Sequence, residues 1–320
     1  MEKIQVLLAT YNGSKYIREQ INSILNNFQY LQDYDCGIII SDDNSTDNTV
    51  NIINECFHHN EKVRLLSASR KGGVKNNFTY LIEHADADFL FFCDQDDLWL
   101  PEKLRIFMDA FNKNTNEKNT PLLVHSDLCV TDSLLSPIHK SMFEYQKINK
   151  HPSFANLIVS NSITGCVLGI NRALLNIIKE KNINESIMHD WYIGLVASCF
   201  GRIIFIPKSL ILYRQHSNNQ VGAKEFSFSE IFNFTKITKI KQSIYLTKMQ
   251  AELFLNDFND TLESKEKQLL VSYIKSFDSN FFLRFNLFFK KGIRKYGFVR
   301  NSVFFIFYVV FAKLINAKNK

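Results

Sequence analysis

Two carboxylates separated by one residue, Asp94 and Asp96, come directly after the short apolar run Phe89–Cys93. Carboxylates at this spacing can converge on one hard cation, because Mg²⁺ and Mn²⁺ prefer oxygen ligands and can leave coordination positions open for a diphosphate. A solvated acidic turn before the next helix would carry the same pattern. The residues alone therefore allow two interpretations here, a divalent-metal site and an acidic loop.

A second polar cluster follows another apolar run and contains the adjacent carboxylates Asp42 and Asp43. A carboxylate at this place can accept a hydrogen bond from a ribose hydroxyl or from a base N–H. Tyr11, which follows the first apolar run of the chain, can stack on or cover a base. Thr46 or Asp47 can instead cap the helix that comes next, so part of this cluster can be purely structural.

A further carboxylate, Asp190, opens an apolar helical pattern that extends to about Phe200. It fits two roles, the N-cap of that helix or a general base whose oxygen faces a cleft. Farther along, Arg214 can bind a phosphate as a fixed cation, and His216 can bind either a metal or a phosphate. None of these residues identifies a function alone.

These polar clusters are separated by apolar runs that alternate with segments of helical spacing. Short continuous runs are typical of buried strands, and strands that alternate with helices predict an α/β domain with a mostly parallel sheet. Ligands of such sheets bind beyond the carboxyl ends of the strands, where the acidic clusters fall. The expected strands are Ile4–Ala9, Gly37–Ile40, Val63–Leu66 and Phe89–Cys93, extended by Leu122–His125, Cys166–Ile170 and Ile203–Ile206; the expected helices are Tyr16–Phe28, Thr49–Phe57, Val74–His84 and Leu104–Phe111, then Phe228–Phe254 and Glu263–Phe277.

The composition supports a folded protein and excludes several classes. Hydrophobic residues make up 46% of the chain and charged residues 22%, which excludes a disordered chain. Neither a GxGxxG nor a GxxxxGK motif occurs, which disfavours a dinucleotide-dependent dehydrogenase and a P-loop enzyme. The six cysteines lack metal-binding spacing, and the N-terminus runs directly into Ile4–Ala9 without a signal-peptide pattern. We therefore expect reduced thiols and a cytoplasmic protein.

The C-terminal part of the chain is helical, aromatic and basic. Between Arg284 and Lys320 there are nine Lys and Arg and no Asp or Glu, and the remaining 29 basic and 32 acidic residues leave a balance of −3. Because the basic excess is local, it does not predict nucleic-acid binding. The apolar run Val303–Ala312 is too short to span a bilayer, which needs about 20 residues. We expect residues 223–320 to associate with an anionic membrane surface, with a buried helix or a dimer contact as the alternatives.

The order and detail of the motifs resemble a family-2 glycosyltransferase of the GT-A type. Ala9–Gly13, Ser41–Asp47 and Asp94–Asp97 are similar to the nucleotide-sugar half of that family, and His189–Trp191 and Tyr213–His216 are similar to its acceptor half. The motifs are most similar to the bacterial rhamnosyltransferase branch, which uses dTDP-rhamnose. The resemblance covers about residues 4–222 and implies a GT-A catalytic domain over residues 1–222, followed by a helical, basic C-terminal region over residues 223–320.

The resemblance also implies a role for each matching position and a requirement for Mg²⁺ or Mn²⁺. Asp190 would be the catalytic base, and His189 and Trp191 would lie on the acceptor side. The implied metal ligands are Asp94, Asp96 and His216. The implied donor-binding residues are Ala9, Thr10, Tyr11, Asn12, Asp42, Asp43, Asn77, Asp94 and Arg214.

The chain departs from the usual family pattern at a few positions. His189 stands where the family often has an acidic residue, so only Asp190 carries over as the base. Gln95 replaces the usual small residue of the metal motif and leaves the spacing of its carboxylates unchanged. The QxxRW motif of processive synthases is absent, since Gln215 is followed by His216, and this favours the transfer of one sugar per encounter.

The expected function is therefore inverting, metal-dependent transfer of one sugar, with dTDP-rhamnose as the best-matching donor, to a saccharide acceptor. By resemblance, the acceptor would be lipid-linked, in capsule or O-antigen synthesis, and the enzyme would lie peripherally on the inner face of the cell membrane. The nearest alternative is the same fold with a UDP-hexose or UDP-N-acetylhexosamine donor. A nucleotidyltransferase is disfavoured because no Gly-rich basic loop follows Ile4–Ala9. An inactive membrane-bound scaffold is the remaining alternative.

Overall fold

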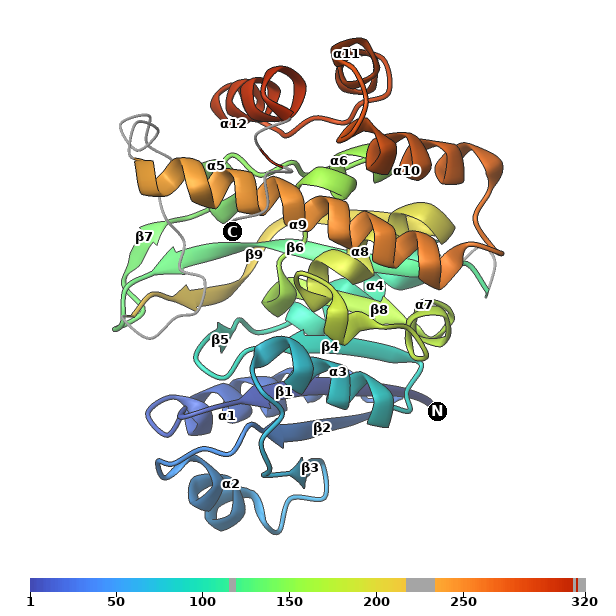
Figure 1. Ribbon diagram of the computed structural model, residues 1–320. Helices are drawn as coiled ribbons and strands as arrows, with labels where there is room; N and C mark the ends of the chain where they lie inside the picture. The colour runs from blue at the N-terminus through green and yellow to red at the C-terminus, as the bar shows by residue number, and fades with distance from the viewer. Residues whose placement is uncertain (115–118, 217–233, 313–314, 316–320) are drawn as a thin grey trace.

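The computed structural model describes residues 1–114, 119–216, 234–312 and 315, and one large sheet lies at its centre (Figure 1). Within these residues the sheet has nine strands in the order β3-β2-β1-β4-β8-β6-β9-β5, and β7 pairs with β6. The strands are β1 (Glu2–Thr10), β2 (Tyr34–Asp42), β3 (Val63–Ser67), β4 (Phe89–Cys93), β5 (Leu98–Trp99), β6 (Leu122–Thr131), β7 (Pro137–His139), β8 (Leu168–Asn171) and β9 (Arg202–Arg214).

The strands from the N-terminal part of the chain form a parallel half-sheet. β1 pairs in parallel with both β2 and β4, and β2 pairs in parallel with β3. On the other side, β8 is antiparallel to both β4 and β6, whereas β6 and β9 are parallel. The sheet is therefore mixed. The predicted parallel arrangement holds for β1 to β4 and for the β6–β9 pair, and the antiparallel β8 joins these two groups.

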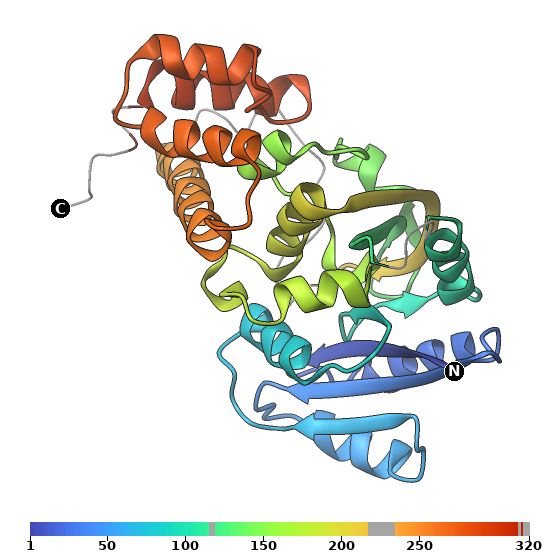
Figure 2. The ribbon, with the colours of Figure 1, turned by 90° about the vertical axis from the view of Figure 1, so that its right-hand side faces the viewer.

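Helices cover both faces of the sheet (Figures 1 and 2). Side chains of α1, α2 and α4 belong to one hydrophobic core, and side chains of α3, α7 and α8 belong to the other. The helices are α1 (Ile17–Phe28), α2 (Thr49–Phe57), α3 (Val74–His84), α4 (Lys103–Asn114), α5 (Met142–Tyr145), α6 (Phe154–Val159), α7 (Arg172–Ile178), α8 (His189–Phe200), α9 (Phe234–Phe258), α10 (Ser264–Ser276), α11 (Phe281–Phe289) and α12 (Phe298–Phe304).

Strand β1 explains why the central strands have continuous apolar sequences. Alternate side chains of a strand point to opposite faces, so Val6 and Leu8 enter one core while Leu7 and Ala9 enter the other. Both faces are covered by helices, and all four side chains are buried. The apolar-run criterion therefore located the strands of the parallel half correctly. All six cysteines are free, as expected.

The C-terminal helices pack against the α/β domain through a shared core. Phe254 and Phe258 of α9 lie in the same hydrophobic cluster as Tyr192 of α8, and the Tyr192 hydroxyl donates a hydrogen bond to Asp257. Helices α10 to α12 follow at the end of the molecule farthest from α2 (Figure 1). The predicted domain boundary at residues 222 and 223 and the predicted helix start at Phe228 lie outside the described residues.

The apolar run Val303–Ala312 is divided between the interior and the surface. It contains the end of α12 and a π-helical turn, Phe305–Val310. Phe304 and Tyr308 are buried, whereas Ile306 is 43% exposed. Among the described residues, no helix combines the length and the apolarity needed to cross a bilayer.

Gly201 joins α8 to β9 at a point where two backbone segments approach closely. An added Cβ would lie only 2.0 Å from the carbonyl oxygen of Pro121, to which the N–H of Arg202 donates. We expect Gly201→Ala to lower the free energy of unfolding by about 1–3 kcal/mol, because the backbone must shift to admit the methyl group. Urea denaturation measures this. Gly37→Ala is the control, since its Cβ would meet only the Lys62 carbonyl at 3.6 Å; equal stability losses in both variants would contradict the explanation.

Candidate active site

A cleft of about 1500 Å³ lies at the carboxyl ends of β1, β2 and β4. It exceeds the volume of about 300–1,000 Å³ that is typical of small-molecule sites, so two substrates can be accommodated together. The predicted site residues that line it are Ala9, Thr10, Tyr11, Asn12, Asp43, Asn77, Asp94, Asp96, His189, Asp190 and His216. Asp42, Arg214 and Trp191 lie behind its walls.

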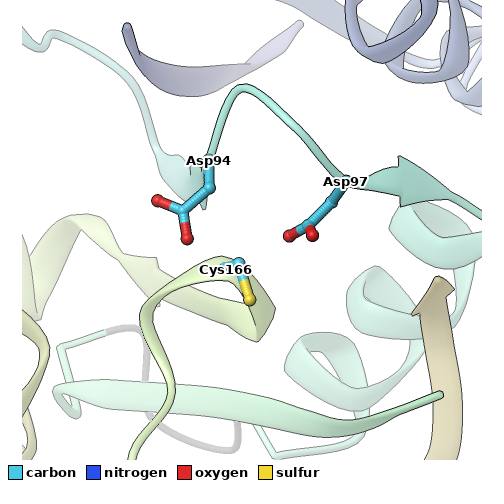
Figure 3. Close-up of side chains that lie close together, drawn as sticks. All are labelled: Asp94, Asp97 and Cys166. Atoms are coloured by element: carbon cyan, nitrogen blue, oxygen red, sulfur yellow. The ribbon is translucent and has the colours of Figure 1, made fainter. Parts of the chain in front are cut away.

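The loop after β4 brings acidic side chains together in this cleft. One ligand atom each of Asp94, Asp97 and Cys166 lies within 4.8 Å of the others (Figure 3). Asp96 lies in the same loop, and its Oδ2 is 2.8 Å from Nε2 of His216. The spacing of Asp94 and Asp96 in the sequence thus corresponds to two carboxylates on one side of the cleft. Asp97 and Cys166 were not predicted as site residues.

A divalent cation fits the charge and the atom types of this loop. Burial, reinforced by the negative charges of Asp96 and Asp190, raises the pKa of Asp94 to about 7. The ionised form is therefore costly by itself, and a bound cation would favour it. Carboxylate oxygens are the ligands that suit Mg²⁺ or Mn²⁺. The donor set of Asp94, Asp96 and His216 is chemically suited to the expected ion.

Arg214 supports this loop from behind instead of facing a phosphate. Its Nε donates to the Asp96 carbonyl at 2.9 Å, and its backbone N–H donates to Asp97 Oδ1 at 3.2 Å. Its Nη2 donates to Glu19 Oε2, and the guanidinium lies 4.5 Å from the centre of the Tyr16 ring. The expected role of Arg214 as a donor-phosphate ligand is therefore corrected: protein acceptors engage its donors, and the side chain is only 4% exposed.

The loops that follow β1, β2 and β4 are connected by side-chain hydrogen bonds. Gln95 accepts from the Tyr11 N–H at 2.8 Å and donates to the Tyr11 carbonyl at 2.8 Å. The N–H of Asn12 donates to Ser45 Oγ at 2.8 Å, and the Asn12 side chain accepts from the N–H of Thr46 at 2.8 Å. Because Tyr11 is 52% exposed, its ring is accessible to a planar base.

Asp43 organises the loop that enters α3. Its carboxylate accepts hydrogen bonds from the backbone N–H groups of Lys71, Gly72 and Gly73, the last two at 2.9 and 2.6 Å. Partial burial opposes ionisation, but these backbone donors outweigh it and hold the pKa of Asp43 below its ordinary value. Gly72 and Gly73 have φ angles of 90° and 109°, which glycine adopts without steric cost.

Asp42 and Asn77 hold the ends of β1 and β2 together. Asp42 Oδ2 accepts from the Thr10 hydroxyl at 2.7 Å and from the Ser45 hydroxyl at 2.6 Å. Asn77 Nδ2 donates to the carbonyls of Ser41 and Thr10 at 2.8 and 3.3 Å. Asp42 is fully buried. It therefore supports the ends of these strands from within and does not line the cleft.

Asp190 lies in the first turn of α8 and lines the same cleft. The N-cap of α8 is Met188, so the alternative prediction of Asp190 as N-cap is wrong. Its Oδ1 accepts from Asn161 Nδ2 at 3.3 Å, and its Oδ2 accepts from the Gly165 N–H at 3.1 Å. Burial raises the pKa of Asp190 to about 6 in spite of these donors. The carboxylate is thus ionised at neutral pH and remains a useful proton acceptor.

The two neighbours of Asp190 have different surroundings. The ring of His189 stacks on Phe78 and Phe92 with centroid distances of 4.3 and 5.8 Å, and burial lowers its pKa to about 3, so the imidazole is neutral. Trp191 points away from the cleft, because its indole N–H donates to the Leu157 carbonyl at 2.6 Å. The expected acceptor-side position of Trp191 is therefore corrected to a packing position.

The sequence of this chain is similar to known glycosyltransferases. The model of the Glycosyl transferase family 2 matches residues 5–175. The dTDP-rhamnosyl transferase RfbG of Shigella flexneri is 33% identical over 225 residues, which cover 68% of this chain and 74% of the relative. This chain belongs to glycosyl transferase family 2. The predicted family and its rhamnosyltransferase-like character are thereby confirmed.

Solved structures at low sequence identity share the fold of this family 2 chain. The crystal structure of TarS 1-349 from S. aureus in complex with UDP-GlcNAc has a TM-score of 0.56 at 18% identity, and the match covers 91% of this chain and 74% of the TarS 1-349 chain. The mannosyltransferase PcManGT from Pyrobaculum calidifontis, in complex with GDP-Man and Mn²⁺, has a TM-score of 0.52 at 14% identity, and covers 88% of this chain and 72% of PcManGT. The predicted GT-A fold with a helical C-terminal region is confirmed.

Several residues that shape the site of this glycosyltransferase were missed in the sequence. Asn161 and Gly165, which donate to Asp190 together with the Trp191 N–H, lie in a polar stretch directly before β8, and that position at a strand end was the available signal. Gly13 leaves space for the Gln95 amide, because a Cβ at Gly13 would lie 2.2 Å from Gln95 Oε1 and would displace that side chain. No local sequence pattern predicts that Glu19 forms an ion pair with Arg214.

We expect Asp43→Ala to speed hydrogen exchange at the amides of Lys71, Gly72 and Gly73 by about tenfold, because these N–H groups lose a charged acceptor. Hydrogen–deuterium exchange with mass spectrometry of peptides from this loop measures the effect. Asp47→Ala is the matched control, since Asp47 accepts from the Ser14 and Thr49 N–H groups instead. Unchanged exchange in the Asp43 variant would show that other contacts hold the loop.

Proposed function

We propose that this protein is an inverting, metal-dependent glycosyltransferase that moves rhamnose from dTDP-rhamnose to a saccharide acceptor. The observation that carries the proposal is the position of Asp190. This hydrogen-bonded carboxylate shares one cleft with the acidic loop of Asp94 and Asp96. A base for the acceptor and a cation site for the donor diphosphate are the two groups that sugar transfer from a nucleotide requires. The similarity to RfbG supports rhamnose as the sugar.

In this proposal, Asp190 removes the proton from the acceptor hydroxyl as its oxygen attacks the anomeric carbon. The bond between that carbon and the diphosphate breaks on the opposite face, which inverts the configuration. The proton stays on a carboxylate oxygen of Asp190, and the leaving electron pair stays on the diphosphate. Asp94, Asp96 and His216 would hold Mg²⁺ or Mn²⁺, which supplies Lewis-acid neutralisation of the leaving phosphate when bound. Tyr11 covers the base on the donor side.

We further propose that the acceptor is a lipid-linked saccharide at the inner face of the membrane, used for capsule or O-antigen synthesis. The basic and aromatic composition of residues 284–320 supports a location near an anionic surface. The volume of the cleft leaves room for the glycan end of such an acceptor beside the donor.

We expect Asp190→Asn to lower the transfer rate by about 10²–10⁴-fold, the usual contribution of a general base, while donor binding is retained. In the wild type, kcat/KM should rise with pH and level off above about 6, because burial raises the pKa of Asp190 to about 6 and only the ionised form accepts a proton. Steady-state rates between pH 5 and 8 and calorimetry with donor test both points. The exposed Asp109→Asn is the control. Wild-type transfer by the Asp190 variant would exclude this base.

We expect hydrolysis and binding of dTDP-rhamnose to require Mg²⁺ or Mn²⁺ and to be abolished by EDTA. The panel contains dTDP-rhamnose, UDP-glucose, UDP-galactose and UDP-N-acetylglucosamine with the purified full chain. Preference for a UDP-sugar would preserve the mechanism and exclude the rhamnosyl assignment, and no binding of any donor would favour an inactive scaffold. Asp96→Ala should weaken metal binding in calorimetry without donor present, because it removes a carboxylate ligand.

A further inference from the structure

Helix α11 exposes four phenylalanines on one side. Phe281, Phe282, Phe285 and Phe289 are 40%, 78%, 42% and 53% exposed. Residues four positions apart lie above one another on a helix, so Phe281, Phe285 and Phe289 form a row, which Phe282 widens. Successive rings of the row contact each other, with centroid distances of 5.7 and 4.5 Å. We call these four residues the aromatic face.

The outer side of α11 is apolar, unlike that of a surface helix in water, while its inner side buries Leu287 and Phe288. The only charged residue of α11, Arg284, is 4% exposed and points inward, where its guanidinium donates to the carbonyls of Val309, Ser276 and Ser279. A helix that faces water normally turns its charged side chains outward and its aromatic side chains inward. The outer side of α11 is therefore suited to surroundings less polar than water.

The apolar surface continues from α11 onto the next segment. The ring of Phe289 lies 5.9 Å from that of Phe305, which begins the π-helical turn after α12. Ile306 and Val310 of that turn are 43% and 44% exposed, and Phe311 directly after it is 48% exposed. Exposed apolar side chains that gather on neighbouring segments mark an interaction site.

Basic side chains accompany the aromatic face. Lys290, Lys291 and Arg294 follow α11 directly and are exposed. The sequence contains no acidic residue between Arg284 and Lys320. In a symmetric dimer through this face, these cations would meet their own copies without acidic partners in the same segment. An anionic lipid surface instead provides both the negative charge and the apolar layer that aromatic rings enter.

We propose that the aromatic face, with Lys290, Lys291 and Arg294 beside it, docks onto an anionic leaflet of a lipid bilayer. The phenylalanine rings enter the boundary between headgroups and acyl chains, and the cations contact lipid phosphates. Docking at this end places the membrane opposite α2 and β3, which occupy the far end of the molecule in both views (Figures 1 and 2). The proposal concerns lipid binding alone and does not depend on the donor or on the reaction.

The test is vesicle flotation with the full chain, using phosphatidylcholine vesicles with and without 30% phosphatidylglycerol. We expect binding to the anionic vesicles, weakened by high salt. The triple variant Phe282→Ser, Phe285→Ser, Phe289→Ser should bind at least ten times more weakly. Lys290→Gln with Lys291→Gln should bind more weakly at low salt and lose part of the salt dependence. Tyr30→Ser with Ile138→Ser, which removes exposed apolar side chains elsewhere, is the matched control and should bind like the wild type.

The thermal melting temperature and the metal affinity of the triple variant are measured as controls for correct folding. Both should equal those of the wild type, because the replaced rings are exposed. Failure of the wild type to bind anionic vesicles would overturn the proposal, as would equal binding by the triple variant. Sedimentation that showed a dimer lost in the triple variant, without vesicle binding, would assign the face to a second copy of the chain. Donor binding is measured separately, so the lipid-docking proposal and the proposed glycosyltransferase function can each fail without the other.

Discussion

The crowding of three carboxylates, Asp94, Asp96 and the buried Asp97, at the end of β4 is the constraint on which the rest of the site depends. Desolvation, with the negative charges of Asp96 and Asp190 as a second cause, opposes ionisation of Asp94 and raises its pKa to about 7. The protein tolerates this arrangement because cationic and hydrogen-bonding groups surround the loop. Arg214 holds its backbone and Asp97 from one side, and His216 contacts Asp96 from the cleft. A divalent cation would complete the same balance of charge.

A buried lysine connects this acidic loop to the proposed base. Lys103 is fully buried, and desolvation lowers its pKa to about 8. Its ammonium lies 3.3 Å from the centre of the Trp99 ring and donates to the Cys166 carbonyl at 3.3 Å. Cys166 belongs to the 3₁₀ turn Gly165–Val167, whose first N–H donates to Asp190. The cation beside the acidic loop thus also contacts the turn that hydrogen-bonds to Asp190.

The features that the sequence predicted well are those that local chemistry determines. The predicted bounds of α2, α3 and β4 were correct to the residue. A strand that is buried on both faces has a continuous apolar sequence, and a helix that is buried along one side has apolar residues at helical spacing. The features that it did not predict depend on contacts between distant segments. Arg214 pairs with Glu19 across 195 positions, so a cation that seemed suited to phosphate proved to support a loop. The antiparallel entry of β8 between β4 and β6 likewise follows from chain connections and leaves no local pattern.

The same distinction applies to the C-terminal region. Apolar and aromatic residues recur along its sequence between charged ones, and the sequence does not indicate which rings pack inward and which face outward. The structure separates them: Phe254 and Phe258 of α9 enter the core that holds α8, whereas the aromatic face of α11 points away from it. Asp257 of α9 accepts from Tyr192, two residues beyond the proposed base. A surface that contacts α11 is therefore connected to the cleft through packed helices, so its orientation relative to Asp190 is determined by the fold itself.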